Sequence, residues 1–211
     1  MRAFSVLSLS LVAALALGCG DDDVQHLIEN GDFETGDLTS WTISNGGSGT
    51  YRVTDDTLVA STPTEGGVLP PPQGTYAAIS DMDNPGTHIL YQDVDIPGGA
   101  QAAFRATIYL KNLHADYIIA PTAGLAFDGG ESNQQFRIDA MDPAAAVDDV
   151  GAGVLLNIYQ TQPGDSLVTG YRTVSADLSS LAGETVRIRF AQVQTQFFLH
   201  VGIDQVDVTA Q

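Results

Sequence analysis

The chain has 211 residues, of which 44% are hydrophobic, and this is enough to build one domain with a sizeable core. Lys and Arg number 8 against 26 Asp and Glu, so the formal net charge is −18. This charge disfavours nucleic-acid binding, because phosphate contacts need a basic patch. The 22 Gly and 9 Pro, with short runs of Val, Ile, Thr, Tyr and Phe between them, favour β-structure over helices.

Residues 1–18 have the pattern of an export signal, in which Arg2 precedes an apolar run that is too short to span a membrane comfortably. The end of this run, Leu15-Ala16-Leu17-Gly18-Cys19, resembles a bacterial lipobox, although Ala16 and Leu17 depart from the commonest residues. In a lipobox the signal peptidase cuts before the cysteine, whose thiol carries diacylglycerol. Cys19 is the only cysteine in the chain, so no internal disulfide can form and a lipid anchor is the predicted role. The alternative is an ordinary signal with an incidental cysteine.

The segment after the cysteine predicts where the anchored protein resides. Gly20 follows Cys19, whereas retention in the inner membrane would by analogy place Asp there. The resemblance therefore implies export to the outer membrane of a diderm, with the chain held to the membrane by acyl chains. Residues 19–26 contain Asp21-Asp22-Asp23 and are predicted to form an acidic linker.

The globular domain is predicted to span residues 27–211 and to open with Asn30-Gly31-Asp32-Phe33-Glu34, followed by Trp41. Asn-Gly is a tight-turn dipeptide, since both residues tolerate positive φ. Phe33 is a single large apolar residue between acidic neighbours, which predicts a short strand with one face inward. Trp41, the only Trp, is predicted to lie in the core.

The rest of the chain reads as short strands separated by turns that contain Gly and Pro. Strands are expected at 39–44, 51–54, 57–61, 75–80, 88–96, 102–110, 136–141, 173–178, 185–190 and 197–208. Segment 154–161 fits either a strand or a two-turn helix. In 88–96 both sets of alternate residues contain apolar side chains, so the pattern does not decide which set faces the core.

Alternation in 185–190 predicts that Arg187 and Arg189 point outward, and Gly202 is the expected site of a β-bulge or of a close approach. No linker divides the chain after residue 27, so one all-β domain is predicted.

The two ends of this domain carry a family resemblance. The pattern N-G-D-F-E-x-G followed by Trp41 resembles the opening of jelly-roll carbohydrate-binding modules and of the wider galactose-binding-domain-like superfamily. Those domains close with a strand of the form hydrophobic-Asp-x-Val, and Ile203-Asp204-Gln205-Val206 matches it. The two motifs bracket about 180 residues, a usual size for one such domain. The resemblance implies a single jelly-roll β-sandwich of two antiparallel sheets.

The resemblance also implies a structural Ca²⁺ that joins the two ends of the domain. Its ligands would be the Asp32 backbone carbonyl, the Glu34 carboxylate, a carbonyl near Thr75 and Asp204. Such oxygen atoms are the ligands that Ca²⁺ prefers, and extracellular modules bind it with a Kd of about 10⁻⁴–10⁻³ M. In the alternative interpretation, Glu34 and Asp204 are turn-capping or solvated carboxylates.

A sugar site needs exposed aromatic rings for stacking and polar groups for the hydroxyls. Tyr109 faces away from the apolar side of its strand and is the leading candidate. The other candidates are Tyr51, Tyr117, His200 and Phe198. Ordinary packing is the alternative for each of them.

Motifs of common enzymes are missing from the sequence: it has no G-x-S-x-G, no H-E-x-x-H and no P-loop. The sequence therefore predicts a non-catalytic binding module at the cell envelope, with polysaccharide as the candidate ligand. One alternative is a structural or protein-interaction component of the envelope. Another is a small glycoside hydrolase, which would need two carboxylates about 5–10 Å apart.

Overall fold

The computed structural model describes residues 24–55, 69–80 and 84–211. The export signal (1–18), Cys19 and the expected strand at 57–61 lie outside the described residues. The described ranges form eleven strands and one short 3-10 helix, η1 (Ser179–Leu181), which confirms the all-β prediction. None of the helical structure in these ranges is long and apolar enough to cross a bilayer.

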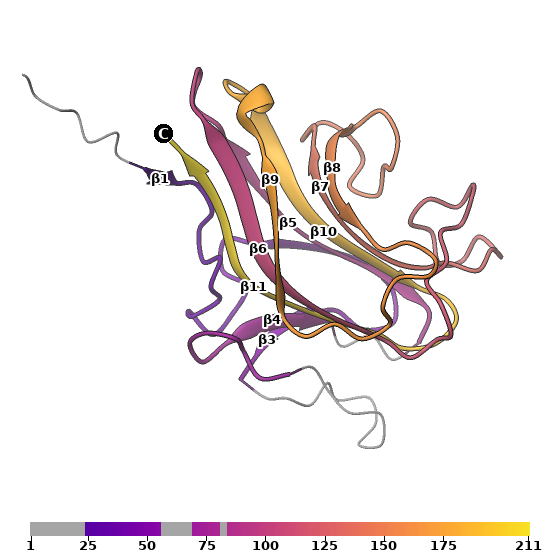
Figure 1. Ribbon diagram of the computed structural model, residues 1–211. Coiled ribbons are helices and arrows are strands. Elements are labelled where there is room, and N and C mark those ends of the chain that lie inside the picture. Colours follow the sequence, from indigo (N-terminus) through magenta and orange to yellow (C-terminus); the bar gives the residue numbers. More distant parts are fainter. Residues whose placement is uncertain (1–23, 56–68, 81–83) are drawn as a thin grey trace, which may run out of the picture.

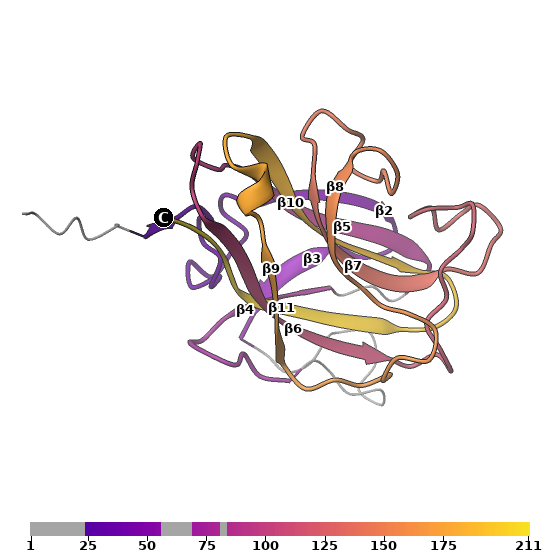
Figure 2. The ribbon, with the colours of Figure 1, turned by 45° about the horizontal axis from the view of Figure 1, so that its top comes forward.

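The strands form two antiparallel sheets that pack face to face (Figures 1 and 2). One sheet has the order β3-β4-β11-β6-β9, and β1 also pairs with β11. Its strands are β1 (Gln25–His26), β3 (Tyr51–Thr54), β4 (Ala77–Ser80), β6 (Ala102–Asn112), β9 (Arg172–Asp177) and β11 (Leu199–Ala210). The other sheet has the order β2-β5-β10-β7-β8. Its strands are β2 (Thr42–Gly47), β5 (Gly86–Asp95), β7 (Gln134–Met141), β8 (Val154–Gln160) and β10 (Thr185–Gln194). The predicted β-sandwich is confirmed.

The core lies between the sheets, where alternate residues of each long strand meet. In β5 these residues are Leu90 and Val94, so the alternating set that contains them faces the core. Ile89, from the other set, joins a second apolar cluster on the outer side of the sheet. Segment 154–160, left open between strand and helix, is the edge strand β8 paired with β7.

Trp41 lies in the core as predicted, with its ring centroid 6.0 Å from that of Phe190 and 5.6 Å from that of Phe33. The prediction of a strand at Phe33 is wrong. Phe33 has a φ of 57° and lies in a turn. The Phe33 amide donates to the Asn30 carbonyl, and the Gly36 amide donates to the Phe33 carbonyl. The side chain is nevertheless fully buried, because the turn folds inward over the open end of the sandwich.

Arg187 and Arg189 point away from the core as predicted, but both are buried. Loop 142–153 covers this part of the outer surface, and Arg189 Nη1 donates to two carbonyls of that loop at 2.6 and 2.8 Å. Arg189 Nη2 also donates to Asp139 at 2.5 Å, and Arg187 makes a bidentate contact with Asp93 at 2.7 and 2.9 Å. Each guanidinium is thereby balanced by a carboxylate on the same face of the sheet, which lowers the cost of burial.

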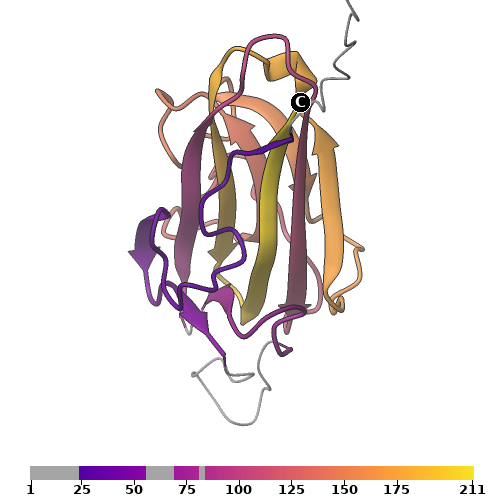
Figure 3. The ribbon, with the colours of Figure 1, turned by 90° about the vertical axis from the view of Figure 1, so that its left-hand side faces the viewer.

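The opening segment lies alongside the last strand (Figure 3). Residues 25–26, predicted to belong to the linker, form β1 and pair with the end of β11. Further along, Val206 N donates to the Gly31 carbonyl at 2.8 Å. The described N-terminal end and the C-terminus therefore share one pole of the sandwich, and the β10–β11 turn lies at the opposite pole (Figure 1).

The β-bulge expected at Gly202 is found instead between Asp204 and Asp207. Gly202 pairs regularly with Ile79 and Tyr109, whereas Gln205 takes a φ of 51° and disturbs the register of β11. The disturbed stretch lies where the opening turn crosses β11, so the local departure from strand geometry belongs to the junction of the two ends.

Candidate functional site

The first candidate site is the junction of the opening turn with β11. Glu34 Oε1 accepts hydrogen bonds from the backbone amides of Thr75 and Tyr76 at 2.8 and 2.9 Å. A Cβ at Gly74 would lie 2.2 Å from this same oxygen and would displace the Glu34 carboxylate, and the φ of 67° also favours glycine here. The contact fixes the segment that enters β4 against the opening turn.

Asp204 is the buried acid of this junction, with 1% of its surface exposed. Its Oδ1 accepts from the Gln205 amide at 2.7 Å, whereas its buried Oδ2 has no hydrogen-bond partner. Burial raises the pKa of Asp204 to about 7; nearby Glu34 and Asp32 raise it too, and backbone hydrogen bonds lower it. The Gln73 backbone amide lies near enough to lower the pKa of this carboxyl, yet Oδ2 itself makes no hydrogen bond of normal geometry, and Asp32 and Glu34 add two further negative charges.

These contacts bring the four sequence-predicted metal residues, Asp32, Glu34, Thr75 and Asp204, to one junction. In the described part of the chain, no group of three or more His, Cys, Asp or Glu side chains is arranged to hold a metal. An ion here would therefore need backbone carbonyls among its ligands, and the predicted set contains two. The unpartnered Oδ2 and the all-oxygen donor set fit a hard cation.

The four residues predicted as a ligand-binding set are all buried, so the expectation of exposed rings is wrong for Tyr51, Tyr109, Tyr117 and His200. Tyr109 faces away from the intersheet core as inferred, but only 4% of it is exposed, because it packs on Ile79 and on Tyr171 at a centroid distance of 5.6 Å. Strand alternation places a residue on the outer face of a sheet, but it cannot show that another segment covers that face.

His200 is buried with both ring nitrogens lacking a hydrogen-bond partner. Burial, and to a smaller degree the charge of Lys111, lower its pKa to about 4. The ring packs edge-on against Phe198 at 6.2 Å. His200 is therefore a neutral, packed side chain beneath the β10–β11 turn.

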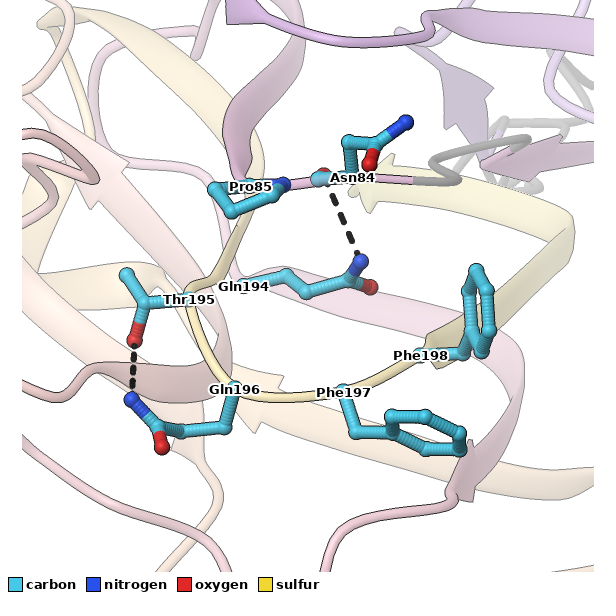
Figure 4. Close-up of a pocket in the computed structure, with 7 residues that line it drawn as sticks. All are labelled: Asn84, Pro85, Gln194, Thr195, Gln196, Phe197 and Phe198. Atoms are coloured by element: carbon cyan, nitrogen blue, oxygen red, sulfur yellow. Dashed lines mark hydrogen bonds between the residues drawn. The ribbon is translucent and has the colours of Figure 1, made fainter.

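That turn forms the second candidate site, which we call the β10–β11 pocket (Figure 4). Its volume is about 230 Å³, and it is lined by Asn84, Pro85, Gln194, Thr195, Gln196, Phe197 and Phe198. Phe197 is 45% exposed and is the one aromatic among the exposed large hydrophobic residues of the described ranges. Its ring meets that of Phe198 at 65°, with the centroids 5.0 Å apart.

Three buried glutamines hold the turn in place. Gln134 reaches it from β7: its Nε2 donates to the Phe197 carbonyl at 2.6 Å, and its Oε1 accepts from the Gln196 amide at 3.4 Å. Gln192 donates to the Leu199 carbonyl at 2.5 Å, and Gln194 accepts from the Leu199 amide at 2.7 Å. The two aromatic rings are thus presented on a backbone that is fixed by side-chain hydrogen bonds.

The lining of the β10–β11 pocket is uncharged and rich in amides. Gln194 Nε2 donates to the Asn84 carbonyl at 3.3 Å. Gln196 donates to Ser132 and Thr195 at 2.9 and 3.2 Å, which leaves its Oε1 without a partner among the described residues. An exposed aromatic face beside amide donors and acceptors is the combination that binds a sugar ring, whose C–H face is apolar and whose edge carries hydroxyls.

Sequence reasoning named Phe198 and passed over Phe197. The available signal was the run Gln194-Thr195-Gln196-Phe197-Phe198, in which two adjacent aromatics follow polar residues between two long strand patterns. Adjacent strand residues alternate sides, so at least one of two neighbouring Phe residues tends to escape burial when the strand ends there.

Comparison with known proteins gives no match among protein-family models or curated proteins. Solved structures do share the fold. TmCBM61, solved in complex with β-1,4-galactotriose, is 14% identical, with 87% of this chain and 97% of that chain covered and a TM-score of 0.50. The K3 cleaved adhesin domain of Lys-gingipain from Porphyromonas gingivalis W83 is also 14% identical, with 89% and 99% covered and a TM-score of 0.51.

These two neighbours are a carbohydrate-binding module and an adhesin domain. At this level of identity the likeness concerns the fold. The expected fold, a β-sandwich of two antiparallel sheets, is confirmed.

Proposed function

We propose that the protein is a non-catalytic carbohydrate-binding module and that the β10–β11 pocket is its ligand site. The observation that carries the proposal is the exposed ring of Phe197 beside amide groups, on a turn that Gln134 holds rigid. The fold shared with a module solved in complex with a galactotriose supports it. A preorganised aromatic corner loses little conformational entropy when a ligand binds.

A glycan array and isothermal titration calorimetry with the purified protein test this proposal. Phe197→Ala is expected to weaken binding by about tenfold or more, because aromatic anchors at a binding site carry a large share of the affinity. The matched control is Phe127→Ala, which removes a half-buried ring on the outer side of the five-stranded sheet. Absence of binding to every glycan would overturn the proposal and leave a structural or protein-interaction role.

We also propose that a structural Ca²⁺ joins the opening turn to β11. The Asp32 and Thr75 carbonyls, the Glu34 carboxylate and Asp204 would hold it, and the unpartnered Oδ2 of Asp204 supports this assignment. Bound there, the ion would supply positive charge between carboxylates and tie together two segments that are far apart in sequence. Isothermal titration with CaCl₂ after chelation tests it, and heat signals that Asp204→Asn leaves unchanged would exclude this site.

An anchored location at the outer membrane is the third part of the proposal, and it rests on the lipobox-like sequence at Cys19. The fold is compatible with such a tether, because β1 and the β10–β11 turn lie at opposite poles (Figure 1), and the pocket at that turn would face away from the membrane. Cys19→Ala should abolish incorporation of labelled palmitate in cells. Unchanged labelling would count against the anchor.

A glycoside hydrolase is not favoured by the junction, although carboxylates meet there. The groove beside them is lined by Asp32 and Asp207 but not by Asp204, which is the buried acid of the group, and the Asp207 carboxylate lies 2.7 Å from the His26 ring. A general acid must reach the glycosidic oxygen of the substrate. The unpartnered oxygen of Asp204 is enclosed in the protein instead.

A further inference from the structure

We infer that the β10–β11 pocket takes a single uncharged sugar residue at the end of a glycan chain, and not an internal stretch of a polysaccharide. This inference rests on the proposed function and names the ligand class of the same site. It follows from the shape, the size and the charge of the pocket.

The shape is a corner. The rings of Phe197 and Phe198 meet edge to face, at 65° and 5.0 Å, so their planes form two walls and not one flat strip (Figure 4). A run of linked sugars stacks on aromatic rings that lie side by side in one plane, one ring for each contacted sugar. Two rings set nearly at right angles can enclose only one sugar ring, with one of its faces on Phe197 and its edge towards Phe198.

The size agrees with one sugar unit. The volume of about 230 Å³ is below the range of about 300–1,000 Å³ that is typical of sites for drug-sized ligands. Asn84-Pro85 lies along one side of the pocket, and Thr195 and Gln196 lie at the end away from the rings (Figure 4). A glycan chain that passed through the site would need an exit at that end. The Gln196 side chain, held there by hydrogen bonds to Ser132 and Thr195, stands in its way.

The charge selects an uncharged sugar. None of the residues that line the pocket is acidic or basic, and the chain as a whole carries a formal charge of −18. A uronic acid or a sulfated sugar would bring a negative charge to a site that has no cation to pair with it, in a repulsive overall field. Gln196 Oε1, on an exposed side chain of the lining, suits a hydroxyl group, which can donate to it.

The rigid backbone turns this shape into specificity. Gln134 fixes the Phe197 carbonyl and the Gln196 amide through one side chain, so the walls and the polar end of the pocket move together. The backbone that carries the two rings therefore cannot move without breaking buried hydrogen bonds, which is costly.

Calorimetry with oligosaccharides of increasing length tests the inference. The probes are the β-1,4-linked galacto-, xylo-, gluco- and manno-oligosaccharides of one to six units, together with galacturonic acid oligomers of the same lengths. For at least one neutral series, the association constant is expected to change less than about threefold between two and six units, and Gln196→Ala should weaken all lengths by the same factor. The matched control is Gln162→Ala, which removes an exposed glutamine from the turn before Pro163.

Three outcomes are distinguishable. A constant that rises tenfold or more with chain length, or stronger binding of the galacturonic series, overturns the single-residue inference and leaves carbohydrate binding in place. Binding to none of the series, in a protein whose circular dichroism shows that it is folded, overturns both. Length-independent binding of a neutral series, lost in Phe197→Ala, supports both.

Discussion

Replacement of Asp204 by Asn tests the junction, because it removes two effects of opposite sign: the cost of a buried carboxylate and the stabilisation that a cation bound to this carboxylate would provide. The carboxylate is buried with Oδ2 unpartnered and two further acids nearby, so without a cation it destabilises the fold. In Asn the carbonyl can keep the hydrogen bond from the Gln205 amide, and the neutral amide group removes the repulsion from Asp32 and Glu34. In the presence of a chelator we therefore expect the variant to be more stable than the wild type.

The magnitudes follow from the geometry and from mass action. An unsatisfied buried polar atom costs about 1–3 kcal/mol, so the variant should gain about that much stability in EDTA. For the wild type, calcium at about ten times a Kd of 10⁻⁴–10⁻³ M adds about 1.4 kcal/mol. In a domain of this size that corresponds to a rise in Tm of about 3–6 °C, which the variant should lack.

The assay is thermal unfolding, followed by circular dichroism, in EDTA and over a range of calcium concentrations, with magnesium as the ionic control. Glu131→Gln is the matched control variant, since Glu131 also accepts two backbone amides, from Thr122 and Ala123, but in a different loop. Glu131→Gln should keep the calcium response and Glu34→Gln should lose it. The reasoning is refuted if Asp204→Asn keeps a wild-type calcium response, or if it is less stable than the wild type in EDTA.

Three further predictions concern other parts of the molecule. Gly31→Ala should destabilise the fold by about 2–4 kcal/mol in urea unfolding, because the added Cβ would lie 1.9 Å from the Val206 carbonyl oxygen. Gly170→Ala is the control: a Cβ there would lie in open space, so the free energy of unfolding should change by less than about 0.5 kcal/mol. Gln134→Ala should weaken glycan binding by about tenfold, because the turn that carries Phe197 loses two of its hydrogen bonds; an unchanged affinity would show that the clamp is irrelevant to the site. The pKa of His200 is lowered to about 4 in the folded protein, so the unfolded chain takes up the proton first as the pH falls below about 6.5. The stability contributed by the neutral ring is therefore present above that pH and is lost below it. The loss between pH 7 and pH 5 should be about 2 kcal/mol, and His200→Phe should remove that part of the pH dependence; an identical pH profile in the variant would contradict the assignment.

Residues whose behaviour depends on local pattern were predicted well. The strand at 102–110 is found as β6, and the one at 185–190 as the first part of β10, because regular alternation of apolar and polar residues specifies a sheet with one face inward. Trp41 was placed in the core because a Trp that enters a strand usually serves burial. Phe33 was placed in a strand and lies in a turn, because a single apolar residue among polar ones does not distinguish an extended residue from one with positive φ.

The candidate site was predictable only in part. Asp32, Glu34 and Asp204 were identified from motifs at the two ends of the domain and Thr75 from the family resemblance, and the fold brings the four together. Phe197 was missed, and Tyr109 was mistaken for an exposed ring, since exposure depends on which distant segment covers a surface. Residues far apart in the chain, such as Tyr109 and Tyr171, bury one another, and nothing in the local pattern records that contact.

The sequence by itself determined the all-β class, most of the strands, the acidic surface charge and the motifs that open and close the domain. These properties depend on composition and on short-range periodicity, which the linear chain carries directly. Only the tertiary structure decided which outward residues are solvent-exposed, that Arg189 is covered by the loop after β7, and that the β10–β11 turn presents an aromatic corner. Each of these depends on contacts between segments distant in sequence, and such contacts are set by the packing of the whole sandwich.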